Sequence, residues 1–249
     1  LPARTLLRAT GFKTEVVTDG HVVETHEGNP LDFIDAYQKR FKAALRPGLP
    51  RFCGGLAGYF GYDAVRYIEP KLAKTWKDGG IDTPDILLLQ CEELAVIDNL
   101  SGRLYLIVYA DPTEPEAYFK AKRRLAELGD KLKYSVTAPQ VKRVAAHGVE
   151  REFAKEAYLA AVLKGKEYIA AGDVFQVIVG QRFSAPFTLP PMALYRALRR
   201  TNPSPFLFHL DFGTFTLVGS SPEILVRVRD GEVTIRPLAG TIRRGATPE

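Results

Sequence analysis

Alternation of apolar and polar residues dominates the start of the chain and predicts short β-strands. Residues 3–9, 13–18 and 21–26 share this two-residue period, which turns one face of each strand toward a core. Asp19-Gly20 joins the last two strands, and glycine accepts the positive φ that a two-residue hairpin turn requires. The pattern therefore predicts an antiparallel sheet at this end of the chain.

A helical period replaces the alternation after Asn29-Pro30. Asparagine suits the N-cap of a helix, and proline suits the first helical position because no hydrogen bond is lost there. We expect this helix to run through residue 46 and to end at Pro47-Gly48. Its apolar face would consist of Leu31, Ile34, Phe41 and Leu45.

Two strands and a second helix are expected next. Residues 84–98 and 103–110 read as strands, and residues 114–129 as a helix. The basic cluster on that helix is most simply a solvated face, and it consists of Lys120, Lys122, Arg123 and Arg124. Residues 135–150 show no clear period, so we place a domain boundary there and expect domains at 1–148 and 149–249.

The second half of the chain alternates helices with strands. An amphipathic helix is expected over 152–171, ended by Gly172 in a left-handed cap. The expected elements that follow are strand 174–183, helix 191–200, strands 206–211 and 214–218, and a hairpin over 224–236 that turns at Asp230-Gly231. The fold class is therefore α/β of the α+β type, with large antiparallel sheets layered with helices.

Residues 52–63 hold four glycines with aromatic residues between them. Such a run invites comparison with a phosphate-binding loop. Its spacing matches neither the dinucleotide fingerprint nor the P-loop, and no Lys-Ser or Lys-Thr follows. We therefore interpret the run as strand whose glycines allow another layer to approach closely.

Composition places the chain among globular proteins, with 46% hydrophobic and 25% charged residues. The net charge of +5 is spread along the chain, which favours small anionic ligands over nucleic acid. Cys53 and Cys91 lie outside any metal-binding spacing, so we expect reduced thiols in a cytoplasmic protein. No apolar run is long enough to span a membrane, and both ends look cut, so we expect a fragment.

Two stretches carry candidate chemistry. Residues 237–241 combine small side chains and a threonine hydroxyl, and Arg243 and Arg244 follow. This pattern suits a small anion, although on local pattern alone an ordinary basic loop is the simpler interpretation. Gln176 stands in an otherwise apolar strand. It is either hydrogen-bonded in the interior or faces water at a sheet edge.

Five motifs in order give the chain a resemblance to the chorismate-utilising enzymes, and within them to the anthranilate synthase large subunits. The motifs are Gly54-Gly55-Leu56-Ala57-Gly58-Tyr59-Phe60-Gly61-Tyr62-Asp63, Gly172-Asp173-Val174-Phe175-Gln176-Val177, Asn202-Pro203-Ser204-Pro205-Phe206, Ser221-Pro222-Glu223 and Pro237-Leu238-Ala239-Gly240-Thr241. The resemblance implies a lyase that aminates chorismate at C2 and eliminates pyruvate. It also implies Mg²⁺, and ammonia from a glutamine amidotransferase partner.

Two positions distinguish the members of this family, and both point to anthranilate synthase. Relatives that make aminodeoxychorismate with a lysine nucleophile carry that lysine where this chain has Ala239. Isochorismate and salicylate synthases carry a lysine base where this chain has Gln176, which cannot usefully take a proton at neutral pH. The resemblance also implies that Gly240 contacts chorismate through its backbone and Thr241 through its hydroxyl, while Gln176 lines the nucleophile side.

The resemblance implies a feedback site as well. Pro205, Phe206 and Leu207 match part of the family's pocket for L-tryptophan. The Mg²⁺-binding glutamates and the histidine acid of the family are expected beyond Glu249, so we expect the fragment alone to be inactive. The alternatives are an aminodeoxychorismate or isochorismate synthase, and a non-catalytic module that binds tryptophan or the amidotransferase.

Overall fold

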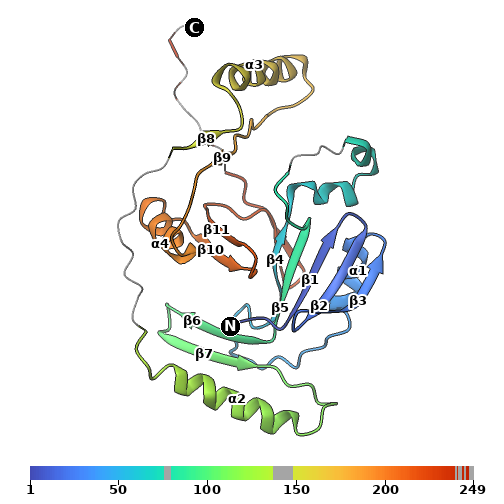
Figure 1. Ribbon diagram of the computed structural model, residues 1–249, viewed down its shortest axis with the longest axis vertical. Helices are drawn as coiled ribbons and strands as arrows, with labels where there is room; N and C mark the ends of the chain where they lie inside the picture. The colour runs from blue at the N-terminus through green and yellow to red at the C-terminus, as the bar shows by residue number, and fades with distance from the viewer. Residues whose placement is uncertain (76–79, 137–147, 239, 241–242, 244, 247–249) are drawn as a thin grey trace. The chain divides into compact units, whose positions relative to one another are not determined.

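The chain forms two compact units, Leu1–Thr137 and Ala138–Glu249 (Figure 1). A computed structural model describes residues 1–75, 80–136, 148–238, 240, 243 and 245–246. Both units consist of antiparallel strands with helices, in agreement with the predicted α+β class. The assignment of 1–148 and 149–249 to separate domains remains a prediction.

The first unit is organised around a five-stranded antiparallel sheet. Its strands lie in the order β3-β2-β1-β5-β4. Their bounds are Thr5–Thr10 (β1), Lys13–Thr18 (β2), His21–Glu27 (β3), Gly55–Phe60 (β4) and Ile86–Cys91 (β5). The turn between β2 and β3 has positive φ at both central residues, so the predicted hairpin is confirmed.

Helix α1, Pro30–Gln38, packs against this sheet. Its start is as predicted, because the side-chain oxygen of Asn29 accepts the backbone N–H of Leu31 at 3.0 Å. The helix and the sheet bury one apolar cluster, which supplies the main hydrophobic stabilisation of the unit. The buried members of the cluster are Leu7, Ala9, Val16, Phe33, Tyr37, Ala64, Ile86 and Leu88.

The predicted extension of α1 to residue 46 is wrong. Arg40 lies just beyond the helix and forms two hydrogen bonds with Glu24 of β3, at 2.6 and 2.8 Å, while its guanidinium lies 5.0 Å from the Tyr37 ring centroid. Phe41 and Leu45, expected on the buried face, are 53% and 62% exposed. The ring of Phe41 lies 5.2 Å from that of Tyr37, but these exposed side chains gain too little packing to extend the helix.

The predicted single strand over 84–98 is two strands. The first is β5 of the large sheet, and the second is β6, Glu93–Asp98, which pairs with β7, Arg103–Val108, in a separate two-stranded sheet. Helix α2, Ala117–Lys131, packs on β7. A continuous apolar run gives no signal at the residue where the chain passes from one sheet to another.

One arginine of α2 does not belong to a solvated face, contrary to the prediction for the basic cluster. Arg124 donates two hydrogen bonds to the carboxylate of Glu93, at 2.8 and 2.9 Å, and so joins α2 to β6. These bonds lower the pKa of Glu93. The other three basic residues of the cluster are exposed, as predicted.

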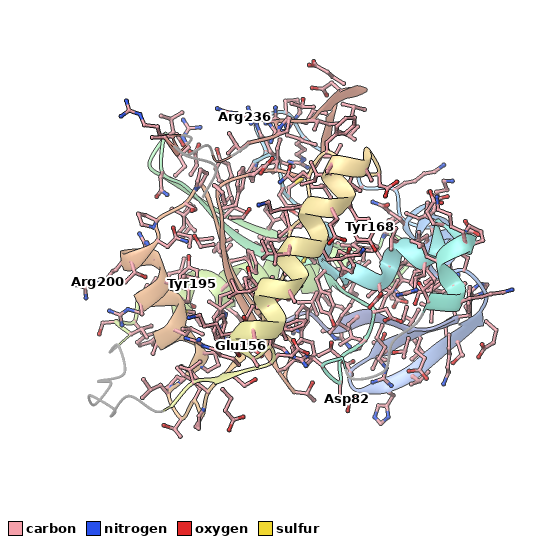
Figure 2. The ribbon with its side chains drawn as sticks, turned by 90° about the horizontal axis from the view of Figure 1, so that it is seen from above. Asp82, Glu156, Tyr168, Tyr195, Arg200 and Arg236 are labelled. Atoms are coloured by element: carbon pink, nitrogen blue, oxygen red, sulfur yellow. The ribbon has the colours of Figure 1, made fainter. Side chains whose placement is uncertain are left out.

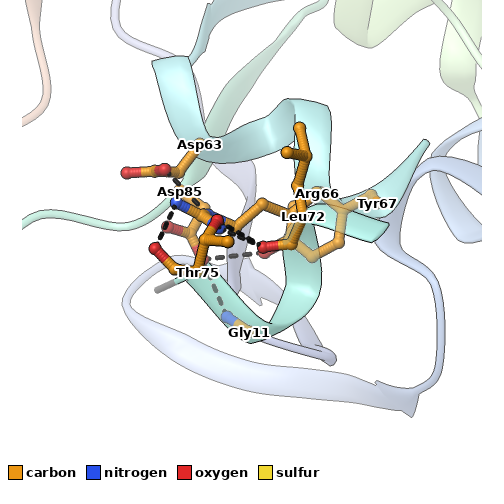
Figure 3. Close-up of polar contacts among 7 residues, drawn as sticks. All are labelled: Gly11, Asp63, Arg66, Tyr67, Leu72, Thr75 and Asp85. Carbon is orange, nitrogen blue, oxygen red and sulfur yellow. Dashed lines mark hydrogen bonds and ion pairs between the residues drawn. The ribbon is translucent and has the colours of Figure 1, made fainter. Parts of the chain in front are cut away.

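Asp85 ties the start of β5 to two other segments of the unit (Figure 3). Its Oδ2 accepts the backbone N–H of Gly11 at 2.8 Å and the hydroxyl of Tyr67 at 2.7 Å. Tyr67 ends the short helix η1, Tyr62–Tyr67, which is followed by η2, Pro70–Thr75. Arg66 braces the same turn by donating to Asp63 and to the carbonyl of Leu72 (Figure 3).

Replacing Tyr67 with phenylalanine is expected to reduce the loss of stability at high pH. Burial first, and then the hydrogen bond to Asp85, raise the pKa of Tyr67 above its ordinary value of 10.0. The folded state therefore holds the phenolic proton more tightly than the unfolded chain. This stability is fully present below pH 10 and is lost as the pH rises through the folded pKa.

Urea unfolding at pH 7 and at pH 11 measures this effect. Tyr67→Phe should cost about 1 kcal/mol at pH 7, through the lost hydrogen bond, and should lose less further stability than wild type at pH 11. Tyr62→Phe, at a ring that is 95% exposed, is the matched control and should leave the free energy of unfolding at pH 7 unchanged. An unaltered difference between the two pH values in Tyr67→Phe would contradict the assignment.

In the residues of the second unit that the structure describes, there are three short antiparallel pairs and two helices. The pairs are β8 (Glu150–Arg151) with β9 (Phe183–Ser184), β10 (Phe206–Asp211) with β11 (Thr216–Ser221), and β12 (Arg227–Arg229) with β13 (Glu232–Thr234). The helices are α3, Lys155–Ala171, and α4, Pro191–Thr201. Asp230 and Gly231 have φ of 50° and 78°, so the predicted turn of the last hairpin is confirmed.

Helix α4 packs against the β10–β11 pair. The ring of Tyr195 meets that of His209 on β10 edge to face, with centroids 6.1 Å apart. Arg200 lies near the end of the same helix, as the labelled side chains in Figure 2 show. The contact between Tyr195 and His209 fixes the helix over the strand that begins at Phe206.

The predicted strand over 174–183 is wrong. Of these residues only Phe183 lies in a strand, as the first residue of β9. A strand requires a neighbouring strand for its backbone hydrogen bonds. Residues 174–182 pair with no strand in the part of the chain that the structure describes. Ile178, whose apolar character suggested an interior strand, is 84% exposed.

Candidate functional site

Gln176 lies just beyond the C-terminus of α3, where Glu156 and Tyr168 mark the two ends of the helix in Figure 2. Gly172 ends the helix with φ of 81°, as predicted, and the N–H of Asp173 reaches back to the carbonyl of Tyr168 at 3.0 Å. The side chain of Gln176 is exposed. The structure therefore shows the water-facing alternative for this glutamine, on irregular backbone in place of a strand edge.

The segment after β13 holds the predicted substrate residues. Gly240 is exposed, and a Cβ added to it would meet no atom within 4 Å. Its backbone is therefore open to a ligand, as close approach at a glycine requires. Ala239 and Thr241 lie outside the described residues, so the roles inferred for them remain predictions.

A carboxylate that the sequence analysis named only as part of a motif, without a role in the site, reaches this segment. Oε1 of Glu223 accepts the backbone N–H of Leu238 at 2.7 Å, two residues before Gly240. The hydroxyl of Ser221 donates to the carbonyl of Glu223 at 3.0 Å and accepts its N–H at 3.3 Å. Glu223 ends the short motif that begins at Ser221, and its place in that motif was the signal that the sequence offered.

The three residues predicted to bind an effector lie at the start of β10. Pro205 precedes the strand, Phe206 is 44% exposed and Leu207 is half-buried. Phe206 pairs with Ser221 and Leu207 with Ser220 across the β10–β11 ladder. An exposed aromatic ring beside a rigid proline turn is consistent with an apolar ligand surface.

Hydrogen bonds thus connect the predicted effector residues at the start of β10 with the predicted substrate segment after β13. Phe206 is paired with Ser221, Ser221 bonds to Glu223, and Glu223 bonds to Leu238 in the substrate segment. All of these residues belong to the second unit. No hydrogen bond joins Gln176 to Gly240 in the described part of the chain.

Magnesium is not assigned to any residue of this chain. Within the described ranges, no three histidine, cysteine, aspartate or glutamate side chains lie close enough together to hold a metal ion. The prediction that the ligands lie beyond Glu249 stays a prediction. Cys53 and Cys91 are free thiols, as expected; Cys53 is buried and Cys91 is partly buried.

The first unit also contains an open hollow of about 970 Å³. Its walls include Phe52, Cys91, Glu93 and Tyr105, and none of the predicted site residues lines it. Among the helices that the structure describes, none combines the length and the apolar character that a membrane span requires.

Comparisons with known proteins find relatives over all or nearly all of the chain. A family model described as "chorismate binding enzyme" matches residues 3–249. "Anthranilate synthase component 1" of Neisseria meningitidis serogroup B (strain ATCC BAA-335 / MC58) is 49% identical over 251 residues, covering 100% of this chain and 51% of that protein. The protein of the same name from Pseudomonas putida is 45% identical over 255 residues, covering 100% and 52%.

A solved structure supports the fold. "Crystal structure of anthranilate synthase component I from Streptococcus pneumoniae TIGR4" matches with a TM-score of 0.77 at 28% sequence identity, covering 94% of this chain and 52% of that one. The chain spans about half the length of the curated relatives it matches.

Proposed function

Since the chain belongs to the chorismate-binding enzyme family, we propose that the protein of which it forms part converts chorismate to anthranilate for tryptophan biosynthesis. The observation that carries this proposal is the match of the full chain to proteins named anthranilate synthase component 1, at 45% to 49% identity. Those names do not favour the alternatives that make aminodeoxychorismate or isochorismate.

In the proposed reaction, ammonia adds at C2 of chorismate, the 4-hydroxyl leaves, and the enolpyruvyl group is then lost as pyruvate. The backbone of Gly240 and the hydroxyl of Thr241 would hold the substrate on one wall of the site. Magnesium, when bound, would hold the substrate carboxylate through ligands beyond Glu249. The residues of this chain would supply orientation, which is a large part of catalysis in a two-substrate reaction.

The choice of nucleophile is proposed to rest on two uncharged side chains. Ala239 presents a methyl group, so no lysine amine attacks the ring in place of ammonia. Gln176 is exposed and has no basic nitrogen, so it cannot activate water as a lysine base does. Ammonia is already a nucleophile and does not need such a base.

We also propose the partners that the family implies. A glutamine amidotransferase subunit would supply ammonia, and L-tryptophan would bind at Pro205, Phe206 and Leu207 as a feedback inhibitor. The protein would act in the cytoplasm. The second candidate function, a non-catalytic tryptophan-binding or amidotransferase-binding module, applies to the isolated chain, since residues 205–207 lie within it.

The test is to supply the full-length protein with chorismate, Mg²⁺ and ammonium and to follow anthranilate fluorescence. Fluorescence should rise with the full-length protein and stay at background with the isolated chain 1–249. Metal-dependent anthranilate production by the isolated chain would contradict the proposal that catalysis needs metal ligands beyond Glu249. A full-length protein that consumes no chorismate would overturn the function itself.

A further inference from the structure

Strand β6 of the first unit has one edge without a neighbour. In the part of the chain that the structure describes, β6 pairs with β7 alone, and all six of its residues line the open hollow. Alternate side chains of a strand point to opposite faces, so consecutive lining residues mean that the hollow runs along the backbone edge itself. We propose that this edge binds a further strand, supplied by the segment that is joined to Leu1 in the full-length protein. This interaction is separate from the proposed function, whose residues lie in the second unit.

The ladder between β6 and β7 shows which backbone groups are free to bind a strand. The N–H of Tyr109 donates to the carbonyl of Glu92 at 3.0 Å, directly beyond the last pair of the ladder. Facing residues of an antiparallel pair exchange hydrogen bonds at every second position, so Glu93, Ala95 and Ile97 direct their N–H and C=O groups away from β7. These groups form a row of donors and acceptors along an edge about 20 Å long, on which an extended segment can pair.

The lining of the hollow suits a strand with apolar side chains. Leu94, Val96 and Tyr105 share one face of the small sheet, because Val96 pairs with Tyr105 and Leu94 lies two residues away on the same strand. Leu49 and Phe52 belong to another segment of the lining, and they are 36% and 47% exposed. An occupant with apolar residues at alternate positions would remove this apolar surface from water, which favours binding.

The position of Leu1 indicates the source of the strand. Leu1 lines the hollow, and its ammonium group is near Glu93, whose pKa is lowered first by the hydrogen bond from Arg124 and further by that ammonium. A segment joined to Leu1 therefore enters the hollow directly, and the short connection gives it a high effective concentration there. This chain covers 51% and 52% of the two relatives reported above, so a full-length protein of their size has residues to supply the strand.

A second copy of the chain is a poorer occupant of the same edge. Antiparallel pairing of β6 with itself, in the register that joins all six residues, places Glu93 of one copy opposite Asp98 of the other at both ends. Like charges directly opposite one another destabilise a strand pair. The charges of β6 therefore favour a different strand over a second β6.

Hydrogen exchange in the full-length protein tests whether the edge is paired. After correction for intrinsic rates, the amides of Ala95 and Ile97 should exchange at least about 30-fold more slowly than those of Thr25 and Glu27. Thr25 and Glu27 are matched controls on β3, an outer strand of the large sheet, because the ladder with β2 leaves their N–H groups pointing away from it in the same manner. A smaller difference would overturn the proposal.

Proline at the same kind of position gives a second measurement. Ala95→Pro removes an N–H that β7 does not use, so the change is tolerated at a free edge and harmful at a paired one. It should lower the thermal midpoint of the full-length protein by at least about 5 °C more than Thr25→Pro does. Two variants with the same midpoint would show that nothing pairs with this edge of β6.

A photo-crosslink identifies the occupant. Tyr105 lines the hollow, and in the full-length protein it can be replaced by p-benzoylphenylalanine. Mass spectrometry should find this residue joined, within one chain, to a peptide that precedes Leu1. A crosslink to another part of the chain, to a second copy or to a different protein would overturn the choice of occupant, and so would the absence of any crosslink. Anthranilate formation decides none of these results, so the inference and the proposed function can fail separately.

Discussion

Replacing Gly58 with alanine is expected to cost about 3 kcal/mol or more in the free energy of unfolding of the first unit. Gly58 lies on β4 opposite Leu88 of β5. A Cβ at this position would overlap the carbonyl oxygen of Leu87 and would lie 2.9 Å from the Cα of Leu88. The backbone of β5 is paired on both sides, with β1 and with β4, so it cannot move aside and the edge strand β4 must shift away from it.

Chemical denaturation of the full-length protein, followed by a probe in the first unit, measures this cost. The matched control is Gly129→Ala in α2, where an added Cβ meets nothing within 4 Å. That control should keep stability or raise it by about 0.5–1 kcal/mol, because alanine is the better helix former. Equal stabilities of Gly58→Ala and wild type would show that the close approach of β4 and β5 is not required.

Replacing Thr241 with valine is expected to lower kcat/KM for chorismate by roughly 10- to 100-fold. Valine keeps the shape of threonine and removes only the hydroxyl. If that hydroxyl bonds to an anionic substrate, its loss should cost about 1.5–3 kcal/mol, the usual worth of a hydrogen bond to a charged group. The loss should appear mainly as a higher KM with kcat little changed, because the same bond is present in the bound substrate and in the transition state.

Steady-state kinetics with the full-length protein provides the measurement. Thr10→Val is the matched control, since Thr10 is an exposed residue at the end of β1 in the first unit. It should leave kcat/KM at the wild-type value. A decrease of less than about twofold in Thr241→Val would remove the hydroxyl from the list of substrate contacts.

Local signals in the sequence predicted the elements that local forces stabilise. The hairpin turns at Asp19 and Asp230 were predicted correctly, because each pairs an aspartate with a glycine at positions of positive φ. The cap at Asn29 was also predicted correctly, since its hydrogen bond reaches only two residues along the chain. The glycine-rich run was assigned to a strand because its spacing fits no phosphate loop, and β4 confirms this.

The errors arose where a distant partner decides the structure. The helix expected through residue 46 ends at Gln38, beside an arginine that pairs with Glu24 on another element. The strand expected over 174–183 has the right composition and lacks a described neighbour along most of its length. Period and propensity report what a segment can form, and long-range pairing determines what it does form.

The residues of the candidate site also fall into two groups, those that the sequence identified and those that needed the structure. Motif order identified Gln176, Gly240 and the residues at the start of β10 without any structure. The hydrogen bond from Leu238 to Glu223 required the structure, because it spans fifteen residues and a hairpin. No periodic pattern predicts such a contact, since neither residue signals the other.

Product identity tests the central claim most directly. The full-length protein should be given chorismate and Mg²⁺ with ¹⁵N-labelled ammonium as the only nitrogen source. The products should then be separated and identified by mass spectrometry. We predict anthranilate carrying one ¹⁵N, together with pyruvate. Isochorismate or aminodeoxychorismate as the sole product would contradict the roles assigned to Gln176 and Ala239, and with them the proposed function.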